Sequence, residues 1–458
     1  FLGTQLDLLV DNLTGSKNYG VDGSVRIQTI GDNDGTIEPA DGEKVYLFFG
    51  MRRGGDAYYA LDVTDPDTPR VLWRTDSSEL PGSGQSWSSV TPTRINIAGA
   101  TQNEHKLVLV IGGGYDPSQD AASASTDASG NSIYFVDTIT GDLLWHGTDS
   151  GGTQNFVNSS VGADWSMSYS IPGDIRTLDL NSDGFADRLY AADMGGQVWR
   201  FDITNGNPAS TLVAGGVIGQ LGAGGQVSPT DQSNRRFYYA PDVAIVRTRL
   251  YNFVHVGVGS GHRAHPNSMV THDEFYALRD YSTFTPKNQA AYDAFVPIVP
   301  GDLEDVTSQL NASVPQGSPG WRLSLTGGGG WLGEKVLAEA RTFDGNVYVS
   351  TYRPPLSGSG CAPAIGTTRQ YVLNLFNAAP VTNLDGSVDD FDNDGNQDLA
   401  RARCGVGQKQ MRDGRFLDPA GDPDRPRQGP LPLVEHAVEV KQYGHVWCRP
   451  PSLTQSKV

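Results

Sequence analysis

The sequence lacks a long apolar run and carries little positive charge. Its 458 residues include 34 Lys and Arg against 52 Asp and Glu, which gives a formal charge of −18. No stretch approaches the roughly 20 apolar residues that a membrane helix needs; the strongest, 107–111, is followed directly by three glycines. A chain this acidic also repels phosphate backbones. We therefore expect neither direct membrane insertion nor a nucleic-acid partner.

Cysteine is scarce as well. The three cysteines, Cys361, Cys404 and Cys448, all lie in the last quarter, and no CxxC motif is present. A zinc or redox motif is therefore not supported. We expect a secreted protein in an oxidising compartment, with one disulfide and one remaining thiol. The pairing is open, although Cys361–Cys404 is the pair that we favour.

Glycine, proline and aromatic residues are plentiful by contrast. The chain has 56 Gly and 27 Pro, which disfavour long helices. It also has 8 Trp, 18 Tyr and 16 Phe, too many for a disordered chain. These counts indicate a turn-rich globular protein that is long enough to bury a sizeable core. Because it begins with Phe1-Leu2 rather than Met, we interpret the sequence as a fragment or a processed chain.

One pattern of strands recurs along the chain. A short strand with Pro or Gly precedes a buried strand, which is followed by a strand reading aromatic-x-apolar-Asp and often by Leu-Trp. The first two strands of the five copies are expected at 21–24 and 45–50, 88–93 and 107–112, 170–172 and 188–192, 239–242 and 254–257, and 335–338 and 347–350. The residues that end the third strands are Asp62, Asp137, Asp202, Asp280 and Asn374.

Four strands per repeat predict an all-β protein, a β-propeller. The copies are farther apart than the roughly 40–45 residues of a bare blade, so we expect long inter-strand insertions. We predict about seven irregular, quinoprotein-like blades in one domain over 1–458, the stretch 444–447 helping to complete the last, and a variable insertion at 375–435. The Trp residues at blade ends are expected to pack between blades.

Two short acidic loops are the sharpest chemical signal. The first reads DxNxDGxxD at 179–187 and the second DxDxDGxxD at 390–398. Alternate positions turn side-chain oxygens toward one point, the glycine permits a sharp turn, and Ca²⁺ requires six to eight such hard oxygens. Position 12 is Tyr190 or Arg401 instead of Glu, so neither loop is an EF-hand. The predicted ligands to one or two Ca²⁺ ions are Asp179, Asn181, Asp183, Phe185 and Asp187, and Asp390, Asp392, Asp394, Asn396 and Asp398.

Two weaker patterns have simpler explanations. The run Asp32-Asn33-Asp34-Gly35 with Glu38 could be a third calcium site, but a hairpin turn explains it as well. The histidines at 262, 265 and 272 could bind a transition metal. Glycine and proline dominate their surroundings, so a structured loop between strands is the better interpretation.

Three segments resemble the C-terminal propeller of PilY-type type IV pilus proteins. They are 49–63, reading FGMRRGGDAYYALDV; 187–202, reading DRLYAADMGGQVWRFD and preceded by the first acidic loop; and 259–263, reading GSGHR and followed by FYAL. The resemblance covers roughly residues 21–447 and is weakest in the segment that contains the second loop and Cys404. The family's N-terminal portion, often an adhesive domain, is not part of this sequence.

The resemblance implies a pilus-tip adhesin and biogenesis factor in which calcium acts on function. Such a protein sits on the minor-pilin tip complex, promotes pilus extension, and takes part in surface attachment, twitching motility and virulence. The expected location is the cell surface at the pilus tip, the outer membrane or the periplasm. The expected partners are minor pilins of the tip complex and a host-surface receptor.

Two rival functions remain at this point. Quinoprotein dehydrogenases share the propeller and a motif similar to the stretch 137–145, but their adjacent Cys-Cys pair is missing here. No GxSxG, HExxH, P-loop or Rossmann pattern is present either. We therefore expect a protein that is not an enzyme. The other rival is a binding propeller that has no connection with pili.

Overall fold

The computed structural model describes most of the first 381 residues and three short strands beyond them. The described residues are 19–32, 34–160, 163–226, 228–307, 313–326, 330–355, 366–381, 401–404, 411–412 and 415–416. The second acidic loop, Cys361, Cys448 and the stretch 444–447 lie outside these residues, as does most of the expected insertion at 375–435. Within the described part of the chain, no helix is long and apolar enough to cross a membrane.

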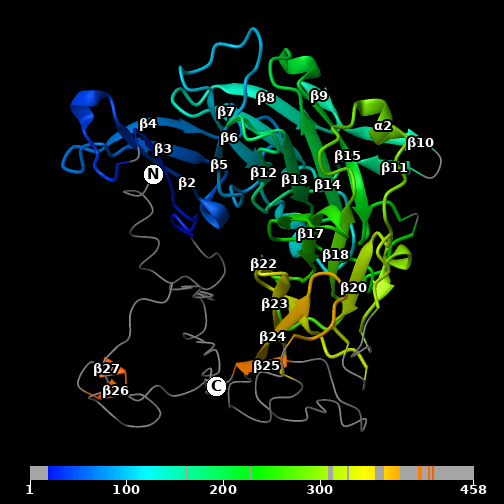
Figure 1. Cartoon of the computed structure of the whole chain (residues 1–458). Helices are drawn as coiled ribbons and strands as arrows, with labels where there is room; N and C mark the ends of the chain where they lie inside the picture. The colour runs from blue at the N-terminus through cyan, green and yellow to red at the C-terminus, as the bar shows by residue number, and fades with distance from the viewer. Residues whose placement is uncertain are drawn as a thin grey trace.

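The described strands form five main sheets in chain order (Figure 1). Blade 1 consists of β1 (Arg26–Ile30), β2 (Lys44–Gly50), β3 (Tyr58–Asp62) and β4 (Arg70–Thr75). Blade 2 consists of β5 (Thr91–Arg94), β6 (Leu107–Gly112), β7 (Ser132–Asp137), β8 (Leu143–Thr148) and β9 (Gln154–Asn155). Blade 3 consists of β12 (Arg176–Leu178), β13 (Arg188–Ala192), β14 (Gln197–Ile203) and β15 (Val213–Gln220).

The last two sheets follow the same plan. Blade 4 consists of β16 (Asp242–Arg247), β17 (Asn252–Gly259), β18 (Glu274–Asp280), β20 (Gly320–Ser324) and the edge strand β19 (Glu304–Asp305). Blade 5 consists of β21 (Lys335–Val336), β22 (Arg341–Phe343), β23 (Asn346–Arg353), β24 (Thr367–Asn374) and β25 (Arg401–Cys404). Two further strand pairs are β10 (Val157–Ser160) with β11 (Ala163–Ser166) and β26 (Met411–Arg412) with β27 (Arg415–Phe416).

The few helical segments are short. They are the 3-10 turns η1 (Pro39–Asp41), η2 (Arg52–Gly54), η3 (Pro117–Asp120), η4 (Ala209–Thr211) and η5 (Pro300–Asp302), and the helix α2 (Gln289–Asp293). All lie in connections between strands, as the high content of Gly and Pro predicts.

The sheets are arranged as the blades of a propeller. In Figure 1 they follow one another around an arc, from the blue blade through cyan and green to the yellow one. Neighbouring blades meet along their first strands: Thr91 Oγ1 donates to the carbonyl of Ile175 at 3.1 Å, and Arg176 Nε donates to the carbonyl of Pro241 at 3.1 Å. The predicted all-β propeller is therefore confirmed. The expectation of about seven blades extends beyond the described residues, which hold these five.

Alternation along the second strands builds the core between blades. In β6, Leu109 and Ile111 pack with blade 1, whereas Val108 and Val110 pack with blade 3. A strand with both faces buried reads as a continuous apolar run, which explains the sequence LVLVIG. The blade-end residues Trp73 and Trp145 are buried, so their predicted packing in the core is confirmed.

The Asp and Asn residues that end the third strands, here called markers, shape the turns that follow them. In four blades the marker side chain accepts the backbone N–H two residues onward, which turns the chain after the strand. The four bonds are Thr64 N to Asp62 at 2.9 Å, Ile139 N to Asp137 at 2.9 Å, Ser282 N to Asp280 at 3.0 Å and Phe376 N to Asn374 at 2.9 Å. Asp202 departs from this rule and joins a buried ion network.

Three predicted first strands were placed too early in the sequence. The strand expected at 21–24 is β1, the strand expected at 170–172 is β12, and the strand expected at 239–242 shares only Asp242 with β16. The segment with Ser170 and Ile171 is extended and buried, but it bonds to turns: the Ser170 carbonyl accepts Met194 N, and Ile171 N donates to the Gly130 carbonyl. The backbone groups of this segment are therefore hydrogen-bonded although it is not a strand of a sheet.

Candidate metal centre

The first acidic loop, 179–187, connects β12 to β13 in blade 3. Its last residue is fixed at both backbone groups: Asp187 N donates to the carbonyl of Leu178 at 2.8 Å, and the Asp187 carbonyl accepts Ile203 N at 2.8 Å. The loop is thus a surface hairpin that is closed by the first pair of the ladder and tied to the third strand of the same blade.

The first carboxylate of the loop turns the chain sharply. Asp179 accepts Ser182 N at 2.7 Å through one oxygen and Gly184 N at 2.8 Å through the other. Ser182 has φ 62° and Gly184 has φ 86°, both in the left-handed region. Glycine adopts that conformation without steric cost, which explains why the sixth position of the loop is Gly.

The other predicted side chains also turn into the loop. Asn181 Oδ1 accepts Asp183 N at 2.8 Å, and Asp183 Oδ1 accepts Phe185 N at 2.8 Å. Asp187 Oδ2 accepts Asn181 N at 3.2 Å and also Leu180 N at 2.8 Å. The structure therefore brings all five predicted residues into one hairpin, and the side-chain oxygens of the four polar ones accept short backbone hydrogen bonds.

Two carboxylate oxygens in the loop contact a side-chain nitrogen. Asn181 Nδ2 lies 3.0 Å from Asp183 Oδ2 and 3.5 Å from Asp187 Oδ1. An electropositive amide group thus sits between two carboxylates, at a place that also suits a cation. Oxygen donors from Asp and Asn are the ligands that Ca²⁺ prefers. The donor set fits the ion.

One flank of the loop rests on blade 2. The Arg94 guanidinium lies 4.8 Å from the centre of the Phe185 ring, and the Arg94 carbonyl accepts Ala186 N at 2.9 Å. Asp179, Asn181 and Asp183 are exposed, while Phe185 and Asp187 are partly covered. The loop is therefore open to solvent on one side and supported by a neighbouring blade on the other.

The carboxylates are held by hydrogen bonds and do not form a ready cage. Among the residues that the structure describes, no group of three or more His, Cys, Asp or Glu side chains is positioned around one point as metal ligands. The loop 390–398 lies outside that part of the chain. Calcium at either loop remains a prediction.

The weaker candidates lie in ordinary connections. Asp32 and Asp34 lie between the paired strands β1 and β2, where the Asp32 side chain accepts Asp34 N at 3.0 Å. His262 and His265 lie in the β17–β18 connection with ring centres 5.0 Å apart, and His272 packs against Trp331 at 5.1 Å. The inter-strand loop predicted for the histidines is confirmed.

The structure contains a second group of polar and aromatic side chains that the sequence did not predict. Arginines from blades 1 and 4 meet over the ring of Trp87, beside Tyr115 and Tyr238. These residues lie in five different connections, so no sequence motif unites them. The only signal was the pair Arg52-Arg53 before two glycines.

Part of the sequence and most of the fold are similar to known proteins. Residues 11–220 match the model of the PilY1 beta-propeller domain. The type IV pilus biogenesis factor PilY1 of Pseudomonas aeruginosa is 30% identical over 162 residues, which are 35% of this chain and 11% of that protein. A PilY1 homolog of Xylella fastidiosa is 25% identical over 348 residues, which are 72% of this chain and 21% of that protein.

A solved structure extends the likeness to most of the chain. The crystal structure of the Pseudomonas aeruginosa PilY1 C-terminal domain aligns with a TM-score of 0.55 at 20% identity, and covers 84% of this chain and 78% of that one. This likeness shows the fold alone. The curated relatives are much longer proteins, of which the matched region spans about a tenth to a quarter. Residues 11–220 are thus similar to the PilY1 beta-propeller domain, and the chain has the fold of a β-propeller.

Proposed function

We propose that this chain is the calcium-binding propeller of a type IV pilus biogenesis protein, acting at the pilus tip on the cell surface, in the outer membrane or in the periplasm. The observation that carries the proposal is the hairpin 179–187, where four inward-turned oxygen-bearing side chains occupy one turn of a PilY1-type blade. The names of the curated relatives, which are type IV pilus biogenesis factors, support the pilus assignment.

In this proposal the side chains of Asp179, Asn181, Asp183 and Asp187 and the carbonyl of Phe185 hold the ion. Calcium supplies charge neutralisation, since three carboxylates within nine residues repel one another without a cation. The second loop, 390–398, would hold another ion through the same spacing of oxygens.

The ion would stiffen a surface that a partner recognises. Both ends of the hairpin are already fixed to blade 3 and one flank rests on blade 2, so ordering its exposed half presents a defined shape. A rigid surface loses less entropy on binding than a mobile one. We propose that minor pilins of the tip complex bind there, and that this supports pilus extension, adhesion to a host-surface receptor, twitching motility and virulence.

The proposed role is not enzymatic. The curated relatives are named for pilus biogenesis rather than for a catalysed reaction. The chemistry of the loop is that of cation binding on an exposed hairpin. Calcium would therefore act on recognition and not on a substrate.

We expect the chain to retain purified minor pilins in calcium and to release most of them in a chelator. In Asp183→Ala the retained pilin should fall at least tenfold in calcium, because the variant lacks a central ligand. The measurement is surface plasmon resonance with the chain immobilised through a terminal tag.

A matched control is Asp65→Ala, which removes an exposed aspartate whose side chain accepts Asp67 N at 3.0 Å in another turn. It should bind pilins as the unmodified chain does. Equal binding in calcium and in chelator would contradict the role of calcium. Absence of binding to every minor pilin under both conditions would contradict the pilus partner.

A further inference from the structure

Three arginine side chains meet over one indole ring. The guanidinium carbons of Arg52, Arg53 and Arg263 lie 4.8, 5.3 and 5.4 Å from the centre of the Trp87 ring. The first two belong to η2 in blade 1, whereas Arg263 follows β17 in blade 4. We call these three arginines with Trp87 the arginine cluster. It concentrates positive charge in a chain whose formal charge is −18.

One member of the arginine cluster already holds a carboxylate. Arg53 Nη2 lies 2.9 Å from Asp120 Oδ1 and Nη1 lies 3.2 Å from Oδ2, a two-pronged pair. The Tyr115 hydroxyl donates to the same carboxylate at 2.6 Å. The pair shows which anion this environment accommodates: a planar carboxylate gripped by a guanidinium fork above aromatic rings.

The other two arginines have no such partner among the described residues. Arg263 Nη1 donates to the Tyr239 hydroxyl at 3.2 Å, and Arg52 Nε is buried without a hydrogen-bond partner. Asp174, one of the acidic side chains that act on Arg52 by charge, is itself paired with Arg26. Asp22 also acts on Arg52 by charge, without forming an ion pair with it.

Burial and mutual repulsion leave these two charges unbalanced. Desolvation, and next the neighbouring Arg263, lower the pKa of Arg52 from its ordinary value. Two guanidinium groups held together without a counter-anion are unfavourable in a partly desolvated place. An anion that joined them would relieve this repulsion.

The backbone of Arg52 is strained as well. Its φ is 51°, in the left-handed region that residues other than glycine rarely adopt. Such strain costs of order 1–3 kcal/mol and is concentrated at ligand-binding sites. The strained backbone places the Arg52 side chain over Trp87, where it meets an arginine from another blade.

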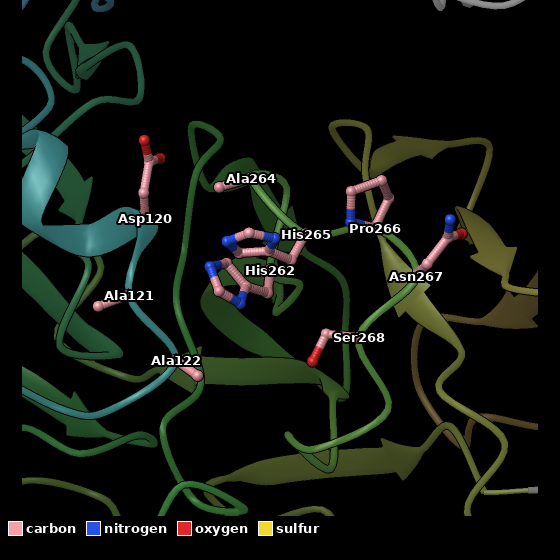
Figure 2. A pocket seen from close by; sticks show the side chains of 9 residues that line it. All are labelled: Asp120, Ala121, Ala122, His262, Ala264, His265, Pro266, Asn267 and Ser268. Carbon is pink, nitrogen blue, oxygen red and sulfur yellow. The ribbon is translucent and has the colours of Figure 1, made fainter. Parts of the chain in front are cut away.

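A cavity of about 450 Å³ adjoins the arginine cluster through Asp120. Figure 2 shows Asp120 on one side of it, the rings of His262 and His265 in the middle, and Asn267 opposite. Burial, Arg236 and His265 lower the pKa of His262 to about 3, so its ring is neutral. Its Nε2 is buried without a partner.

The lining of the cavity suits a peptide. Its polar groups are the imidazoles of His262 and His265, an amide at Asn267, a hydroxyl at Ser268 and the Asp120 carboxylate, which Arg53 already pairs; three alanines and a proline complete the lining. Groups of this kind hydrogen-bond to peptide backbone and contact short side chains. The cationic end of the combined site is confined to the arginine cluster.

We propose that Arg52 and Arg263 bind a side-chain carboxylate of an acidic peptide segment from a partner protein, and that the adjoining residues of this segment occupy the cavity. The partner's carboxylate would form with these arginines the pairing that Asp120 forms with Arg53. The site is separate from the calcium loop, and the inference holds whether or not the pilus partner is correctly assigned.

The test is calorimetric titration of the chain with the peptide acetyl-Gly-Glu-Glu-Gly-amide. We expect saturable binding that weakens at least tenfold in Arg263→Gln and in Arg52→Gln. The matched control is Arg247→Gln, which removes an exposed arginine stacked on a single ring, that of Phe284 at 5.5 Å. It should bind the peptide as the unmodified chain does.

A further variant and a control peptide distinguish a specific carboxylate site from general attraction between opposite charges. Arg52→Lys, which keeps the charge but loses the fork, should bind less tightly than the unmodified chain, and acetyl-Gly-Gln-Gln-Gly-amide should not bind. Equal affinity in Arg263→Gln and Arg247→Gln would overturn the proposal. So would competition by inorganic phosphate at lower concentration than by acetate, which would assign the cluster to phosphate.

Discussion

Replacing Asp202 with Ala is expected to lower the free energy of unfolding by about 3–5 kcal/mol, because it leaves buried positive charge without its partner. Asp202 accepts Arg188 Nε at 2.7 Å and Arg200 Nη2 at 2.8 Å, and both arginine side chains are fully buried. It also accepts the Tyr292 hydroxyl at 2.7 Å and Lys287 N at 2.9 Å. Chemical denaturation of the purified variant measures the change.

The neighbouring carboxylate does not replace the one that is lost. Asp280 already bonds Arg200 Nη1 at 2.8 Å and the Tyr190 hydroxyl at 2.7 Å. Burial opposes its ionisation, but Arg200 and the Tyr190 hydroxyl outweigh burial and hold the pKa of Asp280 below its ordinary value. Asp280 is therefore ionised and engaged, and Arg188 is left with the backbone carbonyls of Thr283 and Thr285 and a longer contact, 4.0 Å from its Nη1 to Asp280 Oδ2.

Asp62→Ala is the matched control, since Asp62 is the same marker in blade 1 and only turns the chain through Thr64 N. Loss of that single, partly buried hydrogen bond should cost about 1 kcal/mol. Equal destabilisation by the two variants would contradict the account of the network. Because Arg188 directly follows Asp187, Asp202→Ala should also loosen the end of the acidic loop 179–187.

The second large effect is expected at Trp199, where substitution by Ala should cost about 3–5 kcal/mol through loss of buried ring volume. The ring is fully buried, stacks on Phe201 at 5.9 Å and meets Trp165 edge-on at 5.6 Å. Its Nε1 donates to Asp193 Oδ2 at 2.7 Å. Thermal and denaturant unfolding both report the loss.

Trp199→Phe separates packing from hydrogen bonding. This variant keeps an aromatic ring but removes the N–H, and should cost about 1–3 kcal/mol. Complete burial raises the pKa of Asp193 to about 7, and the Trp199 N–H is among the contacts that oppose the rise. The apparent pKa of Asp193 should therefore rise further in Trp199→Phe. If Phe costs as much as Ala, the hydrogen bond dominates and the packing argument is wrong.

The repeat and its third strands could be predicted because their signals are local. Each third strand combines aromatic and β-branched residues with a terminal Asp or Asn, and that side chain turns the following backbone wherever it is not drawn into ion pairs. The sequence pattern therefore reports a physical requirement of each blade. Asp202 shares the pattern but has a different partner, which local sequence cannot show.

First strands were harder to place because burial and strand pairing do not coincide. Ser170 and Ile171 are buried and extended, yet their hydrogen bonds go to turns of the neighbouring connections. Whether such a segment pairs as a strand depends on the segments to which it is hydrogen-bonded. Those partners, such as Met194 and Gly130, are distant in sequence, so strand propensity alone placed the strand too early.

The acidic loop 179–187 and the arginine cluster also differ in how far local sequence predicts them. The acidic loop 179–187 is contiguous, and its spacing alone predicts that Asp179, Asn181 and Asp183 turn into one hairpin, as they do. The arginine cluster is brought together by the packing of the blades, from a connection within blade 1, the connection between blades 1 and 2, and a connection within blade 4. Its members, including Trp87 and Arg263, are nearly 180 residues apart in the chain, so only the fold reveals them.

Equilibrium dialysis with radioactive calcium tests the central claim most directly. The unmodified chain and Asp65→Ala should bind the same number of calcium ions, and Asp183→Ala should bind one fewer at the same free concentration. That result would place an ion in the hairpin 179–187 and give the acidic loop its function. If Asp183→Ala binds as many ions as the unmodified chain, with unchanged affinity, the assignment of the loop as a calcium site is contradicted.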